Sequence, residues 1–350
     1  MNHRSRKQGG ETRKLQVTGG STYIVSLPKK WITKNQLKKG SSLTFFEEDD
    51  GSMSIQSSTE LVREEKTDEA LVKVSSNENP DTIIRKTVSA YLVGYNMIRI
   101  KAREQQQLSS RQRNAIKNFA RDLLVGTEIV TDTPTELTLQ VLLSYPELSI
   151  QSALRRMCII TSSMHKDALT ALKELDSQLA ESVIATDDEV DRFNLYVIRQ
   201  LKMAIQNPKI IKEIGLSNAR DCLGYRLVTK SVERAADHAA SIAENVLLLK
   251  KPMDEEVLKN LEEMSNLAVS MFETAIEALF RLDFNLAESV VQKTKEINFT
   301  MKEALLSSKK IGTEEIANIR LVIESLRRTA EYASDIAEIV LNLTVESIIG

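Results

Sequence analysis

The sequence contains few of the residues on which disulfide-bonded, metal-chelating and catalytic proteins depend. Its 350 residues include two cysteines, three histidines and one tryptophan, and only 5% are aromatic. Cys158 and Cys222 have no paired spacing and fall in helical patterns, so we expect reduced core cysteines and no zinc site. The sequence has no apolar run as long as a membrane span, and its N-terminus lacks the apolar segment of a signal peptide. We therefore expect a cytoplasmic protein without membrane insertion.

The residue patterns typical of common catalytic sites are also missing. His3, His165 and His238 lie in unrelated contexts. The sequence contains no nucleophile triad, no Gly-rich phosphate loop and no cluster of zinc ligands. It also lacks the Glu-x-x-His pairs that di-iron helical bundles need. We therefore predict that the protein is not an enzyme.

The composition favours a mainly helical globular protein with an α+β N-terminal part. The content of 42% hydrophobic and 27% charged residues excludes a disordered chain, and 12 glycines with few aromatics favour helix over sheet. The net charge is −2, but residues 1–39 carry ten basic residues and one acidic residue, so that segment has +9 and the remainder has −11. This asymmetry predicts a basic N-terminal head that meets an anionic partner, and an acidic helical body.

Residues 11–57 have the alternation and the turn residues of a small β module. Residues 1–10 are a polar, basic stretch that we expect to be a disordered tail. Gly19-Gly20 and Asp50-Gly51 are turn signals. The expected elements are strands over 12–18, 23–27, 43–47 and 53–56, and a short helix over 29–36.

This order of elements, with Leu-Pro-Lys-Lys-Trp at 27–31, resembles the AbrB-type DNA-binding domain. The resemblance implies an interleaved, swapped-hairpin homodimer in which basic residues of the first strand and of the Pro-Lys turn meet DNA. Carried over by position, these residues are Arg13, Lys14, Lys29, Lys30 and Lys34. The alternative is a solvated basic surface on a dimerisation module, because basic charge alone gives phosphate affinity without base readout.

A small α+β domain is expected over residues 70–146, after a polar linker over residues 58–69. Its predicted order is β-α-β-α-β-β, which suggests an incomplete ferredoxin-like arrangement. The segment carries no recognisable chemistry. Ligand sensing and a role as spacer and dimer arm are both consistent with it.

From residue 147 the pattern is helical and repeats. Asn207-Pro208 breaks the second helix, and Asp176 and Asp283 stand at corresponding positions as helix caps. The pattern predicts two tandem three-helix units, residues 147–252 and 253–350. The six expected helices cover 147–175, 176–206, 216–249, 255–281, 283–308 and 313–343.

The segment from Lys230 to Leu249 contains the most informative pattern. Its apolar residues follow one another at alternating steps of four and three, as in the packed seam of a bundle helix. Glu233 and Asp237 stand beside the seam, four residues apart and on one face. Two such carboxylates repel each other unless a cation or a basic group lies between them, and Lys230 and Arg234 are the basic residues that would pair with them in the simpler alternative.

This helix resembles the signature helix of the PhoU family of phosphate-uptake regulators. The motif is Glu-Arg-x-x-Asp-His-x-x-x-Ile-Ala-Glu, formed by Glu233, Arg234, Asp237, His238, Ile242, Ala243 and Glu244. Ser241 stands where the family usually has Asn. The resemblance implies two tandem three-helix bundles, and metal binding through acidic pairs spaced by four.

A metal site in the first unit is the main candidate site. Asp187 and Asp191 have the same spacing on the preceding helix and would face Glu233 and Asp237 across an antiparallel contact. Carboxylates without histidine or cysteine suit Mg²⁺, Mn²⁺ or an iron ion, with Zn²⁺ as a further candidate of unknown occupancy. The alternative is an acidic, solvated face.

The second unit departs from this pattern. Arg327 stands where Glu233 is found and Glu331 where Asp237 is found, and the facing helix has Thr294 and Asn298. Arg327 and Glu331 are four residues apart and can form an ion pair. Glu331 and Asp335 remain as a weaker second site.

The two resemblances imply a PhoU-like regulator of phosphate uptake and homeostasis with an AbrB-like head. It would act by contact with the phosphate ABC transporter ATPase or its signalling partner, or through DNA binding by the head. The alternative is a metal- or ligand-responsive AbrB-type transcriptional regulator. We expect no catalytic and no organic cofactor site.

Overall fold

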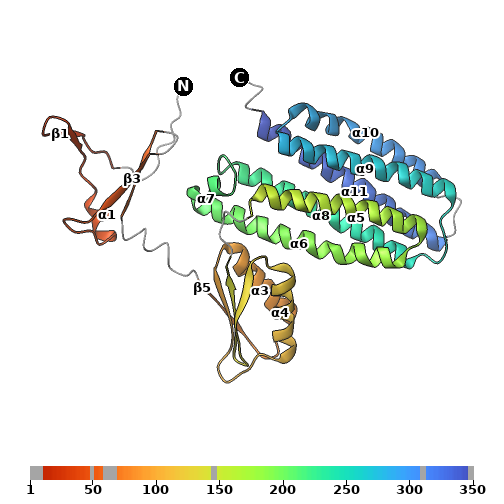
Figure 1. Ribbon diagram of the computed structural model, residues 1–350, viewed down its shortest axis with the longest axis horizontal. Helices are drawn as coiled ribbons and strands as arrows, with labels where there is room; N and C mark the ends of the chain where they lie inside the picture. The colour runs from red at the N-terminus through yellow and green to blue at the C-terminus, as the bar shows by residue number, and fades with distance from the viewer. Residues whose placement is uncertain (1–10, 48–50, 58–68, 143–147, 308–312, 346–350) are drawn as a thin grey trace. The chain divides into compact units, whose positions relative to one another are not determined.

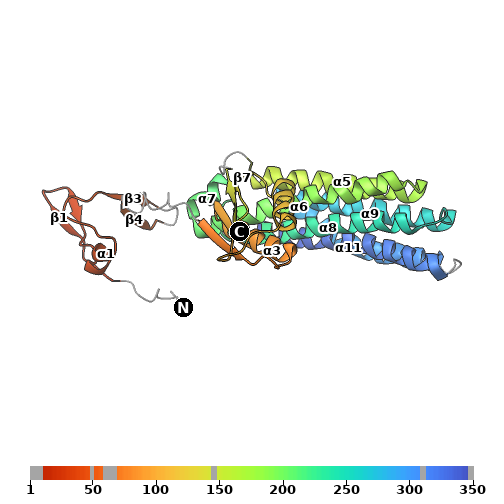
Figure 2. The same ribbon diagram turned by 90° about the horizontal axis from the view of Figure 1, so that it is seen from below.

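The computed structural model describes residues 11–47, 51–57, 69–142, 148–307 and 313–345 (Figures 1 and 2). Contacts within it divide the chain into two compact units, residues 1–67 and 68–350. The predicted disordered tail, Asp50 and nearly all of the predicted linker lie outside the described residues. The division into six parts made from the sequence stays a prediction.

The head consists of two hairpins and a short helix. The first hairpin pairs β1 and β2, which are shorter than predicted. Its turn contains Gly19 and Gly20, which adopt positive φ values of 60° and 83°. The second pairs β3 and β4 in the predicted places. The bounds are β1 (Gln16–Thr18), β2 (Thr22–Ile24), α1 (Lys29–Lys34), β3 (Leu43–Glu47) and β4 (Met53–Ser57).

One copy of the head leaves its apolar side chains in solvent. Leu15, Val17 and Tyr23 of the first hairpin region are 66%, 59% and 67% exposed. Phe45 and Met53 of the second hairpin are 54% and 63% exposed. Hairpins of this size gain independent stability only when an apolar face is covered.

The second unit begins with a four-stranded sheet covered on one face by α3 and α4 (Figure 1). The strand order is β5-β6-β8-β7, with β5 parallel to β6 and the other pairs antiparallel. The predicted order of elements is observed, but both helices precede the final hairpin, so the topology is not that of the ferredoxin-like fold. The bounds are β5 (Glu69–Val74), α3 (Pro80–Val93), β6 (Met97–Ala102), α4 (Ser110–Leu123), β7 (Thr127–Asp132) and β8 (Glu136–Val141).

The rest of the unit is a bundle of long helices with one continuous core. α5, α6 and α8 pack together, as do α9, α10 and α11, and contacts of α8 with α11 and of α5 with α9 join the two sets (Figures 1 and 2). The bounds are α5 (Ile150–Glu174), α6 (Ser177–Gln206), α7 (Pro208–Glu213), α8 (Asp221–Leu248), α9 (Glu255–Arg281), α10 (Phe284–Ser307) and α11 (Thr313–Thr344). Among the residues described, no helix combines the length and the apolar composition needed to cross a membrane.

The two repeats turn between their first and second helices in the same way. Leu175 and Leu282 adopt left-handed φ values of 52° and 51°. Each is followed by an aspartate whose side chain caps the next helix: Asp176 accepts from Leu179 N at 3.0 Å, and Asp283 accepts from Leu286 N at 3.0 Å. The predicted correspondence of the two aspartates is therefore confirmed.

The third helix of the first repeat begins later than predicted. We expected it from residue 216, but α8 starts at Asp221 and the short helix α7 lies before it. Asp221 Oδ2 accepts from the backbone of Ser217 and Asn218, each at 3.2 Å. Such local side-chain bonds compete with helix formation and hold this segment as a turn.

Arg199 of α6 connects the sheet domain to the bundle through hydrogen bonds. Its buried guanidinium donates to the carbonyl oxygens of Tyr91, of Gly94 at 3.0 Å and of Tyr95 at 3.1 Å, and to Asn96 Oδ1 at 2.8 Å. These acceptors lie at and just after the C-terminal end of α3, where the helix dipole favours a cation. The contact fixes the two parts of the second unit relative to each other.

We expect Arg199→Lys to loosen this attachment. A single ammonium group cannot reach four acceptors that a planar guanidinium bridges, so the free energy of unfolding should fall by about 2–3 kcal/mol. Amide hydrogen exchange should become faster at the C-terminal turn of α3. Arg192→Lys, at an exposed position of the same helix, is the matched control. Equal effects of the two substitutions would contradict the assigned role.

Candidate functional site

The predicted acidic residues of the first repeat lie around one helix contact. Asp187 and Asp191 project from α6, and Glu233 and Asp237 from α8, which packs against α6. The charges of Glu233 and Asp237 act on both aspartates of α6. Within the described ranges, however, no three His, Cys, Asp or Glu side chains converge as metal ligands would. The cluster is a region of shared negative charge, without a formed coordination sphere.

The shared charge changes the acidity of this cluster. Burial between the helices, followed by the charge of Asp237, raises the pKa of Asp187 to about 7. Burial, followed by the charge of Glu233, raises the pKa of Asp191 to about 6. The pKa of Asp237 is raised for the same two reasons, although this residue keeps more contact with solvent. A cation or a proton in this region would therefore relieve repulsion.

A basic neighbour already binds the most buried of these carboxylates. Lys230 Nζ donates to both carboxylate oxygens of Glu233, whose residue is only 8% exposed. Arg234 instead lies over the ring of Tyr332, at 5.9 Å from its centroid. The simpler alternative from the sequence is thus observed for Lys230 and Glu233, and the two aspartates of α6 are left to repel each other.

In the second repeat the corresponding position is occupied by cations. Arg327 pairs with Glu331 as predicted, and also with Glu324 at 2.5 Å. Arg328 Nη1 lies 3.1 Å from the other carboxylate oxygen of Glu331. Glu331 is therefore held by two guanidinium groups, whereas burial, and then Glu338 and Glu331, raise the pKa of Asp335. The repeat differs from the first in charge while sharing its fold.

The facing helix α10 has Thr294 and Asn298 where the first repeat has Asp187 and Asp191. Thr294 Oγ1 donates to Ser334 Oγ at 3.4 Å, and Asn298 Nδ2 donates to the backbone oxygen of Thr294 at 3.1 Å. These side chains are engaged within the bundle. The proposed weaker pair of Glu331 and Asp335 stays a prediction.

Two histidines lie near the contact between the repeats. His165 of α5 is buried, with Nε2 at 2.9 Å from the oxygen of Ala235 on α8 and at 3.2 Å from Thr329 Oγ1 on α11. Burial lowers its pKa to about 4, so its ring is neutral at physiological pH. His238 is half-buried, lies 3.3 Å from Ser325 Oγ and stacks on Tyr332. His165 was not predicted to link three helices, because a single histidine in an apolar stripe carries no spacing signal.

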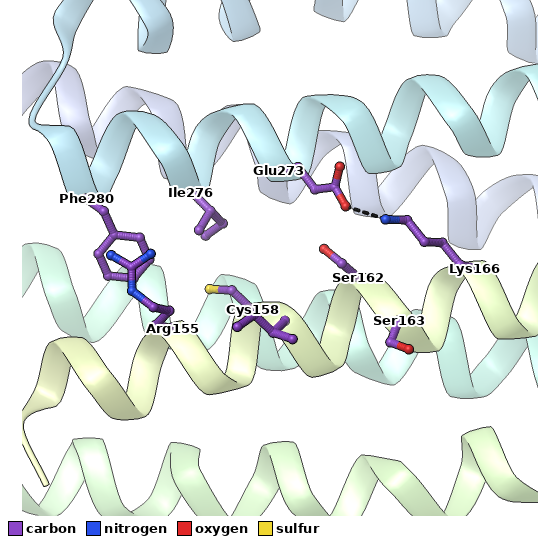
Figure 3. A pocket seen from close by; sticks show the side chains of 9 residues that line it. Arg155, Cys158, Ser162, Ser163, Lys166, Glu273, Ile276 and Phe280 are labelled. Atoms are coloured by element: carbon purple, nitrogen blue, oxygen red, sulfur yellow. Dashed lines mark hydrogen bonds and ion pairs between the residues drawn. The ribbon is translucent and has the colours of Figure 1, made fainter.

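A groove of about 410 Å³ lies between α5 and α9 (Figure 3). At one end Arg155 lies 4.1 Å over the ring of Phe280, and at the other Lys166 binds Glu273 at 2.7 Å. Cys158 lies between them, and burial raises the pKa of its thiol. A protonated, buried thiol is a poor nucleophile. The charged groups of this groove thus hold the two repeats together at its ends.

The cations predicted to meet DNA are all exposed. Lys29, Lys30 and Lys34 belong to α1, and Arg13 and Lys14 precede β1. Arg13 forms an ion pair with Glu11 at 2.6 Å. In one copy these residues form a solvated basic surface.

The raised pKa values predict that acidification stabilises the α6–α8 contact. A carboxyl with a higher pKa in the folded than in the unfolded protein binds more protons when folded, so stability falls as pH rises from about 4 through the folded values of about 6 and 7. We expect Asp187→Asn/Asp191→Asn to raise the free energy of unfolding at pH 8 by on the order of 1 kcal/mol, allowing for solvent screening. At pH 5 the gain should be smaller. Urea unfolding in a chelating buffer, at pH 8 and at pH 5, measures the change in the free energy of unfolding at each pH.

Asp188→Asn is the matched control for this test, because Asp188 is exposed on the same turn of α6. It should change stability much less than the double substitution. If the double variant is no more stable than this control at pH 8, the four carboxylates do not repel one another as described.

Comparison with known proteins assigns the two folded parts to families. The model of the PhoU domain matches residues 154–246 and 261–340, one stretch in each three-helix unit. The model described as antidote-toxin recognition MazE, bacterial antitoxin, matches residues 16–58. The sheet domain over residues 69–142 lies outside these matches.

Individual relatives agree with the family models. The phosphate-specific transport system accessory protein PhoU homolog of Clostridium acetobutylicum is 21% identical over 197 residues, covering 54% of this chain and 88% of that protein. Its counterpart in Borreliella burgdorferi is 27% identical over 187 residues, covering 49% and 81%. The crystal structure of PhoU from Pseudomonas aeruginosa matches with a TM-score of 0.50 at 24% identity, over 56% of this chain and 96% of that one, which shows a shared fold.

The PhoU family consists of regulatory proteins and not of enzymes. Both three-helix units of this chain match its domain, and the order of the units is the tandem order predicted from the sequence. The chain therefore contains two PhoU domain repeats behind an N-terminal domain of the MazE/AbrB-like antitoxin type.

Proposed function

We propose that this protein regulates phosphate uptake and phosphate homeostasis by direct contact between its helical body and the phosphate transport system. The partner would be the ATPase of the phosphate ABC transporter or the signalling protein associated with it. The match of both repeats to the PhoU domain carries the proposal. Relatives that share these repeats are named accessory proteins of phosphate-specific transport.

Deletion and rescue in the source organism test this function. Loss of the protein should raise the uptake of radiolabelled phosphate in phosphate-rich medium, and the full chain should restore restraint. A chain without residues 1–67 should also restore it, since the body makes the proposed contact and forms a separate compact unit. Uptake that is unchanged by deletion would overturn the proposal, and rescue that needs the head would favour an AbrB-type transcriptional regulator.

We further propose that the head forms a homodimer and binds DNA. The exposed apolar side chains of both hairpins support dimerisation, because a second copy would cover them. The exposed cations Arg13, Lys14, Lys29, Lys30 and Lys34 support phosphate contacts. The net −11 of the remaining chain would repel DNA, so the head must supply these contacts.

We predict that DNA binding is strongly salt-dependent and that Lys29→Ala/Lys30→Ala flattens the dependence. Each phosphate contact contributes about one unit to the slope of log K against log salt, so the slope should fall by about two. Affinity for all sequences should fall similarly. Arg13→Ala would change sequence preference if this side chain reaches a base edge. Titrations of a DNA fragment at several salt concentrations measure the slope.

Lys38→Ala/Lys39→Ala removes the same charge from the same head and serves as the control. An equal slope change in this variant would mean that only total charge matters. A fragment of residues 68–350 should not bind DNA and should self-associate more weakly in sedimentation. Binding by that fragment as tight as by the full chain would contradict the role of the head.

We also propose that the first repeat holds a metal ion. Asp187, Asp191, Glu233 and Asp237 fit a hard cation in their chemistry, because they are carboxylates whose mutual repulsion a cation would relieve. Glu233 would exchange its contact with Lys230 for the ion. Such an ion would supply positive charge that joins α6 to α8. Mg²⁺, Mn²⁺, iron and Zn²⁺ are the candidates.

We expect Glu233→Ala/Asp237→Ala to lower the metal content of the purified protein, because it removes the carboxylates of α8. Elemental analysis of the full chain gives the stoichiometry. Glu331→Ala/Asp335→Ala is the matched control in the second repeat and should leave most of the metal in place, since Glu331 is held by two arginines. Unchanged stoichiometry in the first variant would exclude this site.

A further inference from the structure

The face of the four-stranded sheet that α3 and α4 do not cover carries several basic side chains. α3 and α4 cover one face, on which Ile98, Ile100 and Ala102 of β6 are buried. The intervening residues of β6, Arg99 and Lys101, point to the opposite face because side chains alternate along a strand. That face contains an open hollow of about 730 Å³ at the end of β5 and β6.

Three cations line this hollow. Lys73 of β5 and Lys101 of β6 are direct neighbours in the parallel register, and Arg103 follows Lys101 by two residues on the same face. Adjacent strands are about 4.8 Å apart and alternate residues about 6.6 Å apart along a strand, so the backbone positions of the three residues lie within about 10 Å of one another. Like charges directly opposite each other are destabilising unless an anion lies between them.

Nearby carboxylates leave most of this charge uncompensated. Glu136 and Glu69 form ion pairs with Arg99, at 2.8 Å and 3.0 Å. Arg99 is the main cause of the lowered pKa of Glu136, and the charge of Lys101 contributes to it. Glu78 is held by Lys86 and feels the charge of Arg103. Within the described ranges, Lys73, Lys101 and Arg103 form no ion pair, and Glu104 is the one acidic residue of the lining.

A neutral donor and an apolar surface complete the hollow. Gln106 Oε1 accepts from the backbone of Ser76 at 2.9 Å, which fixes the side chain and leaves its amide nitrogen as a donor. The turn that carries it is closed by Gln106 N donating to Arg103 O at 3.0 Å, with Gln105 at a φ of 61°. Leu71, which is 50% exposed, forms the apolar side of the hollow.

We propose that this hollow binds a small phosphorylated ligand with a phosphate chain and an organic body, of the nucleoside di- or triphosphate class. The row of Lys73, Lys101 and Arg103 would bind successive phosphates, and Leu71 would contact the organic part. The volume lies within the range of small-molecule sites, roughly 300–1,000 Å³. The site is independent of the proposed contact with the transport system.

A small ligand fits this face better than a nucleic acid. A polymer that crossed the sheet would meet the carboxylates of Glu69 and Glu136 beside Arg99. It would also meet the negative field of the body, because residues 40–350 carry a net charge of −11. A compact phosphate chain needs only the end of the sheet where the three cations gather.

Calorimetric titration of the full chain with ATP, in a magnesium-free chelating buffer, tests the proposal. We expect saturable binding, with inorganic phosphate and adenosine each at least tenfold weaker because each supplies one part of the contact. Lys73→Ala/Lys101→Ala should weaken ATP at least tenfold, and Arg103→Gln should weaken it independently. Both lysines are exposed and opposed, so their removal should not unfold the domain.

Two charge-matched controls locate the site. Lys259→Ala/Lys295→Ala removes two exposed lysines of the bundle, and Lys29→Ala/Lys30→Ala removes two from the head; both should leave ATP affinity within twofold. The absence of binding at millimolar ATP would overturn the proposal. So would equal affinity for adenosine or for inorganic phosphate, or an equal loss in either control.

Discussion

The close contact between α8 and α11 is the constraint on which the arrangement of the body depends. Alanines such as Ala235, Ala239, Ala330 and Ala333 are fully buried in the core that the two repeats share. At Gly224 of α8 an added Cβ would lie 3.2 Å from Ile339 and 3.3 Å from Leu343 of α11. Small residues let the helices approach, and the apolar surface buried between them stabilises the pair.

A buried polar link reinforces this contact. The ring of His165 reaches from α5 to the backbone of α8 and to Thr329 of α11, so three helices meet at one neutral imidazole. Because the core holds α8 and α11 in place, their polar faces are fixed as well. The carboxylates of Glu233 and Asp237 on α8 are therefore held where their charges act on the aspartates of α6.

The two repeats share their packing and differ in charge. In the first, Asp187 and Asp191 face Glu233 and Asp237, and their pKa values rise. In the second, Arg327 and Arg328 neutralise Glu331. The same helical frame thus presents an acidic surface on one repeat and an ion-paired surface on the other. The basic head and the cationic hollow of the sheet domain add surfaces of opposite sign.

The helices were predictable from the sequence because periodicity and capping act locally. Asp176 and Asp283 marked helix starts, and Asn207-Pro208 marked a break. The short helix α7 and the late start of α8 were not predictable from periodicity, because side chains of the intervening turn, such as Asp221, decide them. The positive φ of Leu175 also has no sequence signal, since the turn imposes it on a residue that normally avoids this conformation.

Contacts distant in sequence explain the other differences. Arg199 reaches four acceptors more than one hundred residues earlier in the chain, which no local pattern could indicate. The acidic cluster was predictable as a set of residues because equal spacing on antiparallel helices brings them to one contact. The pairing of Lys230 with Glu233 was one of two open alternatives, because sequence spacing permits both a salt bridge and a metal ligand.

The difference in charge between the two repeats can be tested by locating bound ions directly. Crystals of the full chain grown with Mn²⁺ would show each ion by its anomalous scattering. We predict a strong peak between α6 and α8, within coordination distance of Asp187, Asp191, Glu233 or Asp237, and at most a weaker peak beside Glu331 and Asp335. A peak at the second repeat alone, or no peak at the first repeat, would contradict the account.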